Sequence, residues 1–302
     1  MHILAITGAP WIWTWWGAVV LINVINLIIG ITIYVKSKNN EKVKSSPYRK
    51  RLLIFGLIFI GVAFYRSIFV SSYLEQLAWF DTLANSSLLI RFFALFAEVS
   101  FAYLIMNVLL NLNKEVPAKE SDKSKPFLRF IETKTPYVFF ISLCLAQFFA
   151  FGGTINKIQL LFAIEETLWG LAFLSITPLI IIQLKRVYSF KEETIKKELK
   201  MYRIFTVFMT VFCVGYSLYS VLYHLPIEQW PLGIEQLQMA IPEPAIRTGF
   251  SAIRDAFSIV NVSRDYSAWG GIGFIIWHSG YFTLCGWMVL FFMTGPRRLI
   301  TI

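Results

Sequence analysis

Seven long apolar stretches constrain this chain more than any other feature of its sequence. An α-helix needs about 20 predominantly apolar residues to cross the hydrocarbon core of a bilayer. The seven stretches therefore predict an all-α fold, a polytopic membrane bundle of seven transmembrane helices that forms a single domain over residues 1–302. The stretches cover residues 11–35, 52–73, 86–112, 137–151, 158–184, 204–225 and 271–293.

The fourth stretch is the shortest of the seven. We expect its helix to start after Pro136, because proline is favoured at the first position of a helix. Gly152 and Gly153 follow its last apolar residue, Phe151, and glycine pairs mark turns. The pattern therefore predicts a tight turn between the fourth and fifth helices at these glycines.

The composition excludes a soluble two-domain enzyme, which a chain of 302 residues could otherwise form. Apolar residues make up 57% of the chain, and the 17 glycines raise this to about 63%, against roughly 45–50% in soluble domains. Charged residues are only 15% of the chain, which is too few to build an ordinary water-facing surface. We expect membrane lipid to be the main surrounding of the protein.

Lysine and arginine are distributed unevenly between the two sides of this bundle. Cytoplasmic loops of membrane proteins retain positive charge. Of the 28 basic residues, 22 fall on one face, four fall on the other, and two lie within predicted helices. This asymmetry predicts an N-terminus outside and a cytoplasmic C-terminus, in the cell or plasma membrane. The net charge of +10 therefore reports topology, and we expect no nucleic-acid partner. The 22 lie in segments 36–51, 114–134, 185–203 and 296–298.

Several classes of membrane protein are excluded by residues that the chain lacks. Its only histidines are His2, His224 and His278, too few for a histidine-box desaturase or a multi-haem cytochrome. The seventh stretch has no lysine for a retinal Schiff base, and no spanning stretch has the aspartates of an intramembrane prenyltransferase. The three cysteines lie in apolar runs without metal-site or disulfide spacing. We expect no bound metal and no cofactor.

The N-terminal segment MHILAITGAP has no lysine or arginine before the first apolar stretch. A cleaved signal peptide starts with a basic region, so we expect the first helix to be retained. Tryptophans gather near the predicted outer ends of helices, and this placement is typical of an interfacial aromatic belt. A stacking platform for a ligand is the alternative. The tryptophans are Trp11, Trp13, Trp15, Trp16, Trp79, Trp230 and Trp269.

The longest connection, residues 226–269, is predicted to lie outside the membrane. Within it, apolar residues from Ile246 to Val260 recur with the period of an amphipathic helix that starts at Pro244. We expect a helix in the outer lipid interface, with a lid over an outward-facing cavity as the alternative.

Polar side chains inside the apolar stretches are the main functional signal. An ionisable group in hydrocarbon costs several kcal/mol, so it must be paired, hydrated or functional. At a rise of 1.5 Å per residue, the charged groups lie in the outer half or at the centre of the bilayer. We predict one polar site, open to the outer side. The candidate ligand-binding residues are Arg66, Arg91, Glu98, Gln147, Glu165, Glu166, Tyr216, His224, His278 and Tyr281.

The helical period places several of these residues on shared faces. Arg91 and Glu98 are two turns apart on one stripe of the third helix. The sixth helix carries a polar seam that ends at His224, and the alternative for such a seam is close helix packing through small side chains. The seam consists of Thr206, Thr210, Cys213, Ser217, Ser220 and His224.

Three functional interpretations remain open at this stage. The first is binding, with possible transport or sensing, of a small anionic or amphipathic ligand; Arg66 and Arg91 would hold an anion and tyrosines would line the pocket. The second is a membrane-embedded metal-dependent enzyme acting on a lipophilic substrate, although the adjacent Glu165 and Glu166 diverge by about 100° on a helix. The third is a structural or partner-binding subunit in which the charges are only ion pairs. Oligomers or partner subunits are compatible with each.

Two N-glycosylation sequons occur in the chain, at Asn85 and Asn261. Both fall on the predicted outer face. The sequons support this topology only if the protein is made in a cell that carries out N-glycosylation.

Overall fold

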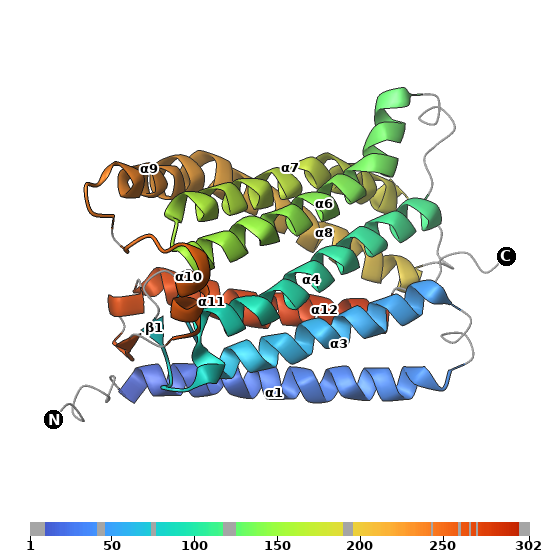
Figure 1. Ribbon diagram of the computed structural model, residues 1–302. Helices are drawn as coiled ribbons and strands as arrows, with labels where there is room; N and C mark the ends of the chain where they lie inside the picture. Colours follow the sequence, from blue (N-terminus) through green and yellow to red (C-terminus); the bar gives the residue numbers. More distant parts are fainter. Residues whose placement is uncertain are drawn as a thin grey trace.

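Seven helices that are long and apolar enough to cross a membrane make up the protein, which is therefore a multi-pass membrane protein (Figure 1). The computed structural model describes residues 10–40, 46–73, 77–116, 125–189, 196–242, 244–258, 261–265, 267–269 and 271–295. The first five spanning helices are α1 (Pro10–Lys38), α3 (Pro47–Ile68), α4 (Ser87–Glu115), α6 (Pro126–Asn156) and α7 (Gln159–Ser189).

The sixth and seventh spanning helices each contain a segment of wider π-helical turns. The sixth consists of α8 (Lys196–Tyr219), the π segment η4 (Ser220–Gln229) and α9 (Trp230–Gln238). The seventh consists of α11 (Ile272–Gly280), the π segment η6 (Tyr281–Cys285) and α12 (Gly286–Thr294). We call the two ends of the bundle the Pro10 end and the Lys38 end, after the ends of α1.

The sixth helix does not stop at Leu225, as the position of Pro226 predicts, but continues to Gln238. Proline lacks the backbone N–H that an α-helix needs and clashes with the preceding turn. The π turns of η4 accommodate Pro226, and the Trp230 N–H donates to the Leu225 carbonyl, five residues back. The connection therefore begins after Gln238 and not at residue 226.

Two further boundaries differ from the prediction. Pro136 lies inside α6, which starts ten residues earlier at Pro126, and Figure 1 shows the first turns of α6 bent away from the rest. Gly152 and Gly153 also lie inside α6, and the turn to α7 is made at Lys157, whose φ is 55°. A Cβ on Gly153 would lie 2.7 Å from the Phe162 ring, so the glycine permits α7 to approach closely.

The second helix ends at Ile68, five residues before the predicted boundary at residue 73. Its start at Pro47 is fixed by Ser46, whose hydroxyl accepts the Arg49 N–H at 3.4 Å, the usual role of a helix N-cap. The chain from residue 69 to the start of α4 carries a two-residue strand, β1 (Leu77–Ala78), and a 3₁₀ turn, η2 (Leu83–Asn85).

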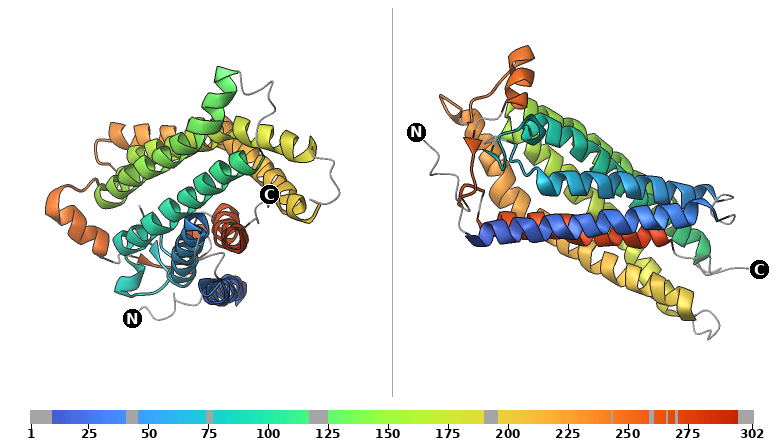
Figure 2. Two further views of the ribbon diagram at one scale, coloured as in Figure 1. Left: turned by 90° about the vertical axis from the view of Figure 1, so that its right-hand side faces the viewer. Right: turned by 90° about the horizontal axis from the view of Figure 1, so that it is seen from below.

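The seven helices form two groups of three with α4 between them. One group contains α1, α3 and the seventh helix, and the other contains α6, α7 and the sixth helix; α4 packs against α3 on one side and α6 on the other. Figure 2 shows the two groups on opposite sides of α4 in the view along the bundle. Side chains on α4 are therefore placed to connect the groups.

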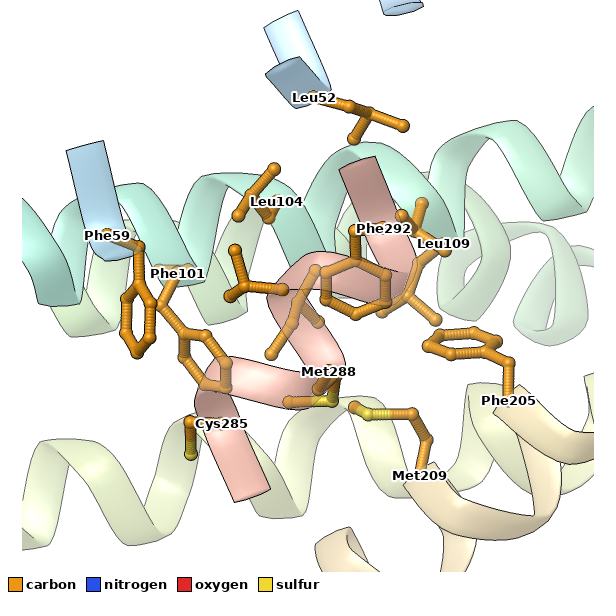
Figure 3. Close-up of a cluster of buried hydrophobic side chains, with 14 of the residues drawn as sticks. Leu52, Phe59, Phe101, Leu104, Leu109, Phe205, Met209, Cys285, Met288 and Phe292 are labelled. Carbon is orange, nitrogen blue, oxygen red and sulfur yellow. The ribbon is translucent and has the colours of Figure 1, made fainter. Parts of the chain in front are cut away.

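A continuous apolar core fills the half of the bundle nearer the Lys38 end (Figure 3). Leu104 and Leu109 of α4, Phe205 and Met209 of α8, and Phe292 of α12 are all buried there. The Phe205 ring centroid lies 5.6 Å from that of Phe292, so the sixth and seventh helices touch at this end. Toward the Pro10 end, Figure 1 shows α9 and α11 well apart.

Five of the seven tryptophans predicted to form an interfacial belt instead pack together around the buried Trp79, whereas Trp11 is 48% exposed. Trp79 has 0% of its surface exposed and packs against Trp13, Trp15, Trp16 and Trp269, with ring centroids 5.7–6.3 Å apart. Hydropathy does not separate an aromatic ring at a lipid interface from one inside a small tertiary core. Through this cluster, the segment after α3 packs against the start of α1 and the start of the seventh helix.

The connection between the sixth and seventh helices packs over the Pro10 end. It contains a short helix, α10 (Gly249–Phe257), and a two-residue strand, β2 (Asn261–Val262), that pairs in parallel with β1. The helix starts at Gly249 and not at Pro244, and Val260 lies outside the described residues. Ala252 and Ala256 are buried where α10 contacts α4 and α6, whereas Phe250 is exposed. The two-stranded pairing is a small β element that the all-α prediction did not include.

Candidate functional site

A hydrogen-bonded charged network joins α4, α6 and α7 near the Pro10 end. Arg91 Nη2 on α4 donates to Glu165 Oε1 on α7 at 2.6 Å and to Gln147 Oε1 on α6 at 3.2 Å. Gln147 Nε2 donates to Glu98 Oε2 at 2.8 Å. Arg91 Nη2 is also 3.6 Å from Glu98 Oε2, so the amide bridges the guanidinium group and the carboxylate that share a face of α4.

Arg66 extends this network into the other helix group. It lies in the last turn of α3, with Nη1 3.8 Å from Glu98 Oε1. Its Nη2 donates to Tyr73 Oη at 2.8 Å, and its guanidinium carbon lies 5.6 Å from the Tyr281 ring centroid. Tyr73 also lies under Arg91, 5.5 Å from its guanidinium carbon. Glu98 therefore lies between Arg66 of α3 and Arg91 of its own helix, α4.

This network is buried and balanced in formal charge. Arg66, Arg91, Glu98, Gln147 and Glu165 are all buried. Two guanidinium groups face two carboxylates. The attraction between such charges offsets the free energy of removing them from water only when they are closely paired and hydrogen-bonded. These contacts hold α4 to both helix groups, so the network has a structural role whatever else it does.

Glu166 points in a different direction from Glu165, as consecutive residues on a helix must. It forms a second cluster with the sixth helix: Tyr216 Oη donates to Glu166 Oε2 at 3.2 Å, and His224 Nε2 lies 3.9 Å from the same oxygen. His224 Nδ1 contacts Glu228 Oε2 at 2.6 Å. The side chains of Glu166 and Glu228 keep 31% and 38% of their surface exposed.

His278 lies on the seventh helix in an aromatic environment. It is 2% exposed, and its ring centroid lies 4.6 Å from Phe282, 5.2 Å from Trp15 and 5.4 Å from Phe274. Neither ring nitrogen has a hydrogen-bond partner in the part of the chain that the structure describes. The hydroxyl of Tyr281, three residues along, also lacks one there.

The ten predicted site residues fall into three neighbouring sets. Five belong to the charged network, three to the Glu166 cluster, and His278 and Tyr281 lie next to Arg66. Two contributing residues, Tyr73 and Glu228, were not predicted. The apolar pattern assigned Tyr73 to the end of the second helix and Glu228 to a loop, because Pro226 precedes it. It therefore did not indicate that either residue lies at the site.

The polar seam of the sixth helix packs against α7. A Cβ on Gly170 would lie 2.5 Å from Ser220 Oγ, which shows how closely the two backbones approach. Thr206 and Thr210 donate to carbonyls of their own helix. The seam therefore follows the helix-packing alternative, and only its last residue, His224, belongs to the candidate site.

The second interpretation from the sequence, a metal-dependent enzyme, requires a cluster of metal-ligating side chains. Among the described residues, no three His, Cys, Asp or Glu side chains are arranged to hold a metal. His224 lies between Glu166 and Glu228 and contacts the two carboxylates through different ring nitrogens, so these three side chains do not converge on one point.

No family model matches this chain. No curated protein and no solved structure is significantly similar to it either. The functional argument therefore rests on the geometry of the three sets of residues.

Proposed function

We propose that the protein binds a small amphipathic ligand among these three sets of residues, which we call the polar layer, from the side of the membrane opposite the cytosol. In this proposal the Pro10 end faces outward and the Lys38 end faces the cytoplasm. The excess of basic residues in the segments that connect helices at the Lys38 end supports this orientation.

The observation that carries the proposal is the exposure of Glu166. Its carboxylate lies on a spanning helix, seven residues or about 10 Å from the start of α7, and keeps 31% of its side-chain surface exposed. A carboxylate that faces hydrocarbon is expensive and is normally hydrated, paired or in use. Tyr216 and His224 contact it without covering it, so it is available to a polar head group.

The exposed aromatic side chains beside His224 support access to this group from the lipid. The sixth and seventh helices touch at Phe205 and Phe292 near the Lys38 end and diverge toward the Pro10 end (Figure 1). The exposed rings of Tyr219 and Tyr223 lie beside His224 on the sixth helix, with Tyr219 stacked on His224 at 5.3 Å. In this proposal, a ligand with an apolar body reaches Glu166 from the lipid beside these tyrosines.

Between the two ligand chemistries expected from the sequence, the geometry favours the amphipathic one. Both guanidinium groups that would attract a free anion already contact carboxylates, Arg66 through Glu98 and Arg91 through Glu165. Sensing or chemistry on the outer side is favoured over bulk transport, because the apolar core of Figure 3 occupies the path to the Lys38 end.

We also propose that α10 lies in the outer lipid interface. Its small side chains, Ala252 and Ala256, pack on the bundle, whereas Phe250, Ile253 and Phe257 face away from it. Large apolar side chains on the free face of a short helix are suited to insertion among lipid head groups and acyl chains.

The test compares amphipathic molecules that remain bound to purified wild-type protein and to Glu166→Gln, after organic extraction and mass spectrometry. Loss of a charge-assisted hydrogen bond should reduce the retained ligand roughly tenfold or more. Glu235→Gln is the matched control, because Glu235 is an exposed carboxylate on α9 of the same spanning helix. Equal retention in all three proteins, at equal folding, would contradict the proposal and favour a purely structural role for the charges.

A further inference from the structure

Three polar groups with unused hydrogen-bonding capacity surround the Phe282 ring. His278 lies 4.6 Å from this ring between centroids, the Tyr281 ring lies at 5.0 Å, and the Arg66 guanidinium carbon lies at 5.4 Å. Arg66 Nη1, Tyr281 Oη and both nitrogens of His278 are buried without a hydrogen bond among the described residues. The nearest carboxylate oxygen to Arg66 Nη1 is that of Glu98, at 3.8 Å.

Packing alone does not account for a histidine at this position. The neighbours of His278 are the aromatic rings of Trp15, Phe274, Trp277 and Phe282. Burying a polar group without a hydrogen bond is destabilising, and phenylalanine would fill much of the same space without this cost. The same reasoning applies to the hydroxyl of Tyr281.

The donors at this place define the chemistry of a ligand. Arg66 Nη1 and Tyr281 Oη offer N–H and O–H groups, and a neutral imidazole offers one N–H in addition. They suit an oxygen that accepts hydrogen bonds. The two arginines nearby are already matched by Glu98 and Glu165, with Glu166 in excess, so a further negative charge would be repelled and the accepting oxygen should belong to an uncharged group.

The walls of the site define the rest of the ligand. The Trp277 ring is about half exposed and stacks on Tyr281, with ring centroids 5.9 Å apart and planes 17° apart. Exposed, stacked aromatic rings suit a flat ring system. The π segment that begins at Tyr281 widens the helix at this point, and π turns within helices are frequent at functional sites.

We propose that Arg66, Tyr281 and His278 hold the carbonyl oxygen of a neutral, lipophilic ring compound of the quinone class, with its ring against Trp277. This assignment rests on the proposed function and names its ligand. It concerns binding only and requires no electron transfer.

The test is a titration of tryptophan fluorescence in detergent-solubilised protein with three probes. Decylubiquinone is the neutral carbonyl probe, laurate is the anionic probe and dodecyltrimethylammonium is the cationic probe. We expect saturable quenching by decylubiquinone, and no saturable change with the other two. Tyr281→Phe and His278→Phe should each weaken decylubiquinone binding about fivefold, the effect of one ordinary hydrogen bond.

Tyr48→Phe is the matched control. Tyr48 is a tyrosine of α3 near the Lys38 end whose hydroxyl, like that of Tyr281, is buried without a hydrogen-bond partner among the described residues, so this variant should bind decylubiquinone as the wild type does. If both His278→Phe and Tyr281→Phe bind it unchanged, or if no probe binds saturably, the assignment is wrong. Binding of laurate or the cation that Tyr281→Phe weakens would also overturn the quinone class, while leaving the proposed function intact. The extraction experiment with Glu166→Gln tests that function separately.

Discussion

Replacement of Arg91 by methionine tests whether the charged network behaves as one unit. Arg91 is the shared cation of the network, with contacts to Glu165 at 2.6 Å, Gln147 at 3.2 Å and Glu98 at 3.6 Å. Glu165 has no other cation within ion-pair distance among the described residues. Arg91→Met therefore leaves a buried carboxylate without its partner, which typically costs about 3–5 kcal/mol of the free energy of unfolding.

The converse change should cost less. Glu165→Met leaves Arg91 with Gln147 and Glu98, so we expect a loss of about 1–3 kcal/mol, in the range of one hydrogen bond to a charged group. The double variant removes both charges and leaves Glu98 next to Arg66 at 3.8 Å. It should be no less stable than Arg91→Met alone, so the coupling energy between the two residues should be at least the cost of Glu165→Met, about 1–3 kcal/mol.

The free energy of unfolding can be measured by titration of mixed micelles with a denaturing detergent, followed by circular dichroism of the helices. Arg254→Met serves as the control, since Arg254 is exposed on α10 and should change stability by less than about 0.5 kcal/mol. If the costs of Arg91→Met and Glu165→Met simply add in the double variant, the two residues do not form a coupled pair. The description of one connected network would then be refuted.

Three further predictions concern packing and topology. Gly170→Ala should destabilise the protein by about 1–3 kcal/mol in the same assay, because the added Cβ meets Ser220 Oγ at 2.5 Å, and Ser220→Ala should restore most of the loss. Trp79→Ala should cost about 3–5 kcal/mol and reduce the near-ultraviolet circular dichroism, because Trp79 is the centre of the buried tryptophan cluster. Expression in glycosylating cells should give a single glycan that Asn261→Gln removes, since Asn261 is exposed and Asn85 is buried beside the start of α4. An unmodified protein would contradict the proposed orientation, and loss of the glycan through Asn85→Gln would contradict the burial of Asn85.

The sequence predicted the features that depend on hydrophobicity alone. Apolar stretches of sufficient length predicted seven spanning helices, and seven are present. The cost of burying charge predicted that the ionisable residues would be grouped, and Arg66, Arg91, Glu98 and Glu165 are in contact. Both arguments use free energies of several kcal/mol, large enough to dominate the local preferences of the chain.

Proline positions predicted the helix boundaries less reliably, because a helix that spans a membrane can continue through a proline. Pro136 and Pro226 both lie inside spanning helices that their positions were expected to bound. In hydrocarbon, an unpaired backbone group costs several kcal/mol, so the chain keeps its helix and widens or bends a turn instead of ending it. Two contacts of the site also depended on boundaries that the apolar pattern misplaced: Tyr73 lies in the segment after α3, where it contacts Arg66, and Glu228 lies one turn beyond His224 in the continued sixth helix.

The position of the apolar core sets a condition on any transport by this protein. Passage toward the Lys38 end requires α8 to separate from α12, which removes Phe205, Met209 and Phe292 from their packing. Burial of each such side chain is worth about 1.5–3 kcal/mol, so separating them costs on the order of 5–9 kcal/mol. A ligand shifts such an equilibrium only by its difference in affinity for the two states, and about 5.5 kcal/mol is needed to move a population from 1:99 to 99:1. A ligand held by the buried network between the two helix groups has contacts to supply this difference, whereas one held only at Glu166 contacts a single group and would leave the core closed.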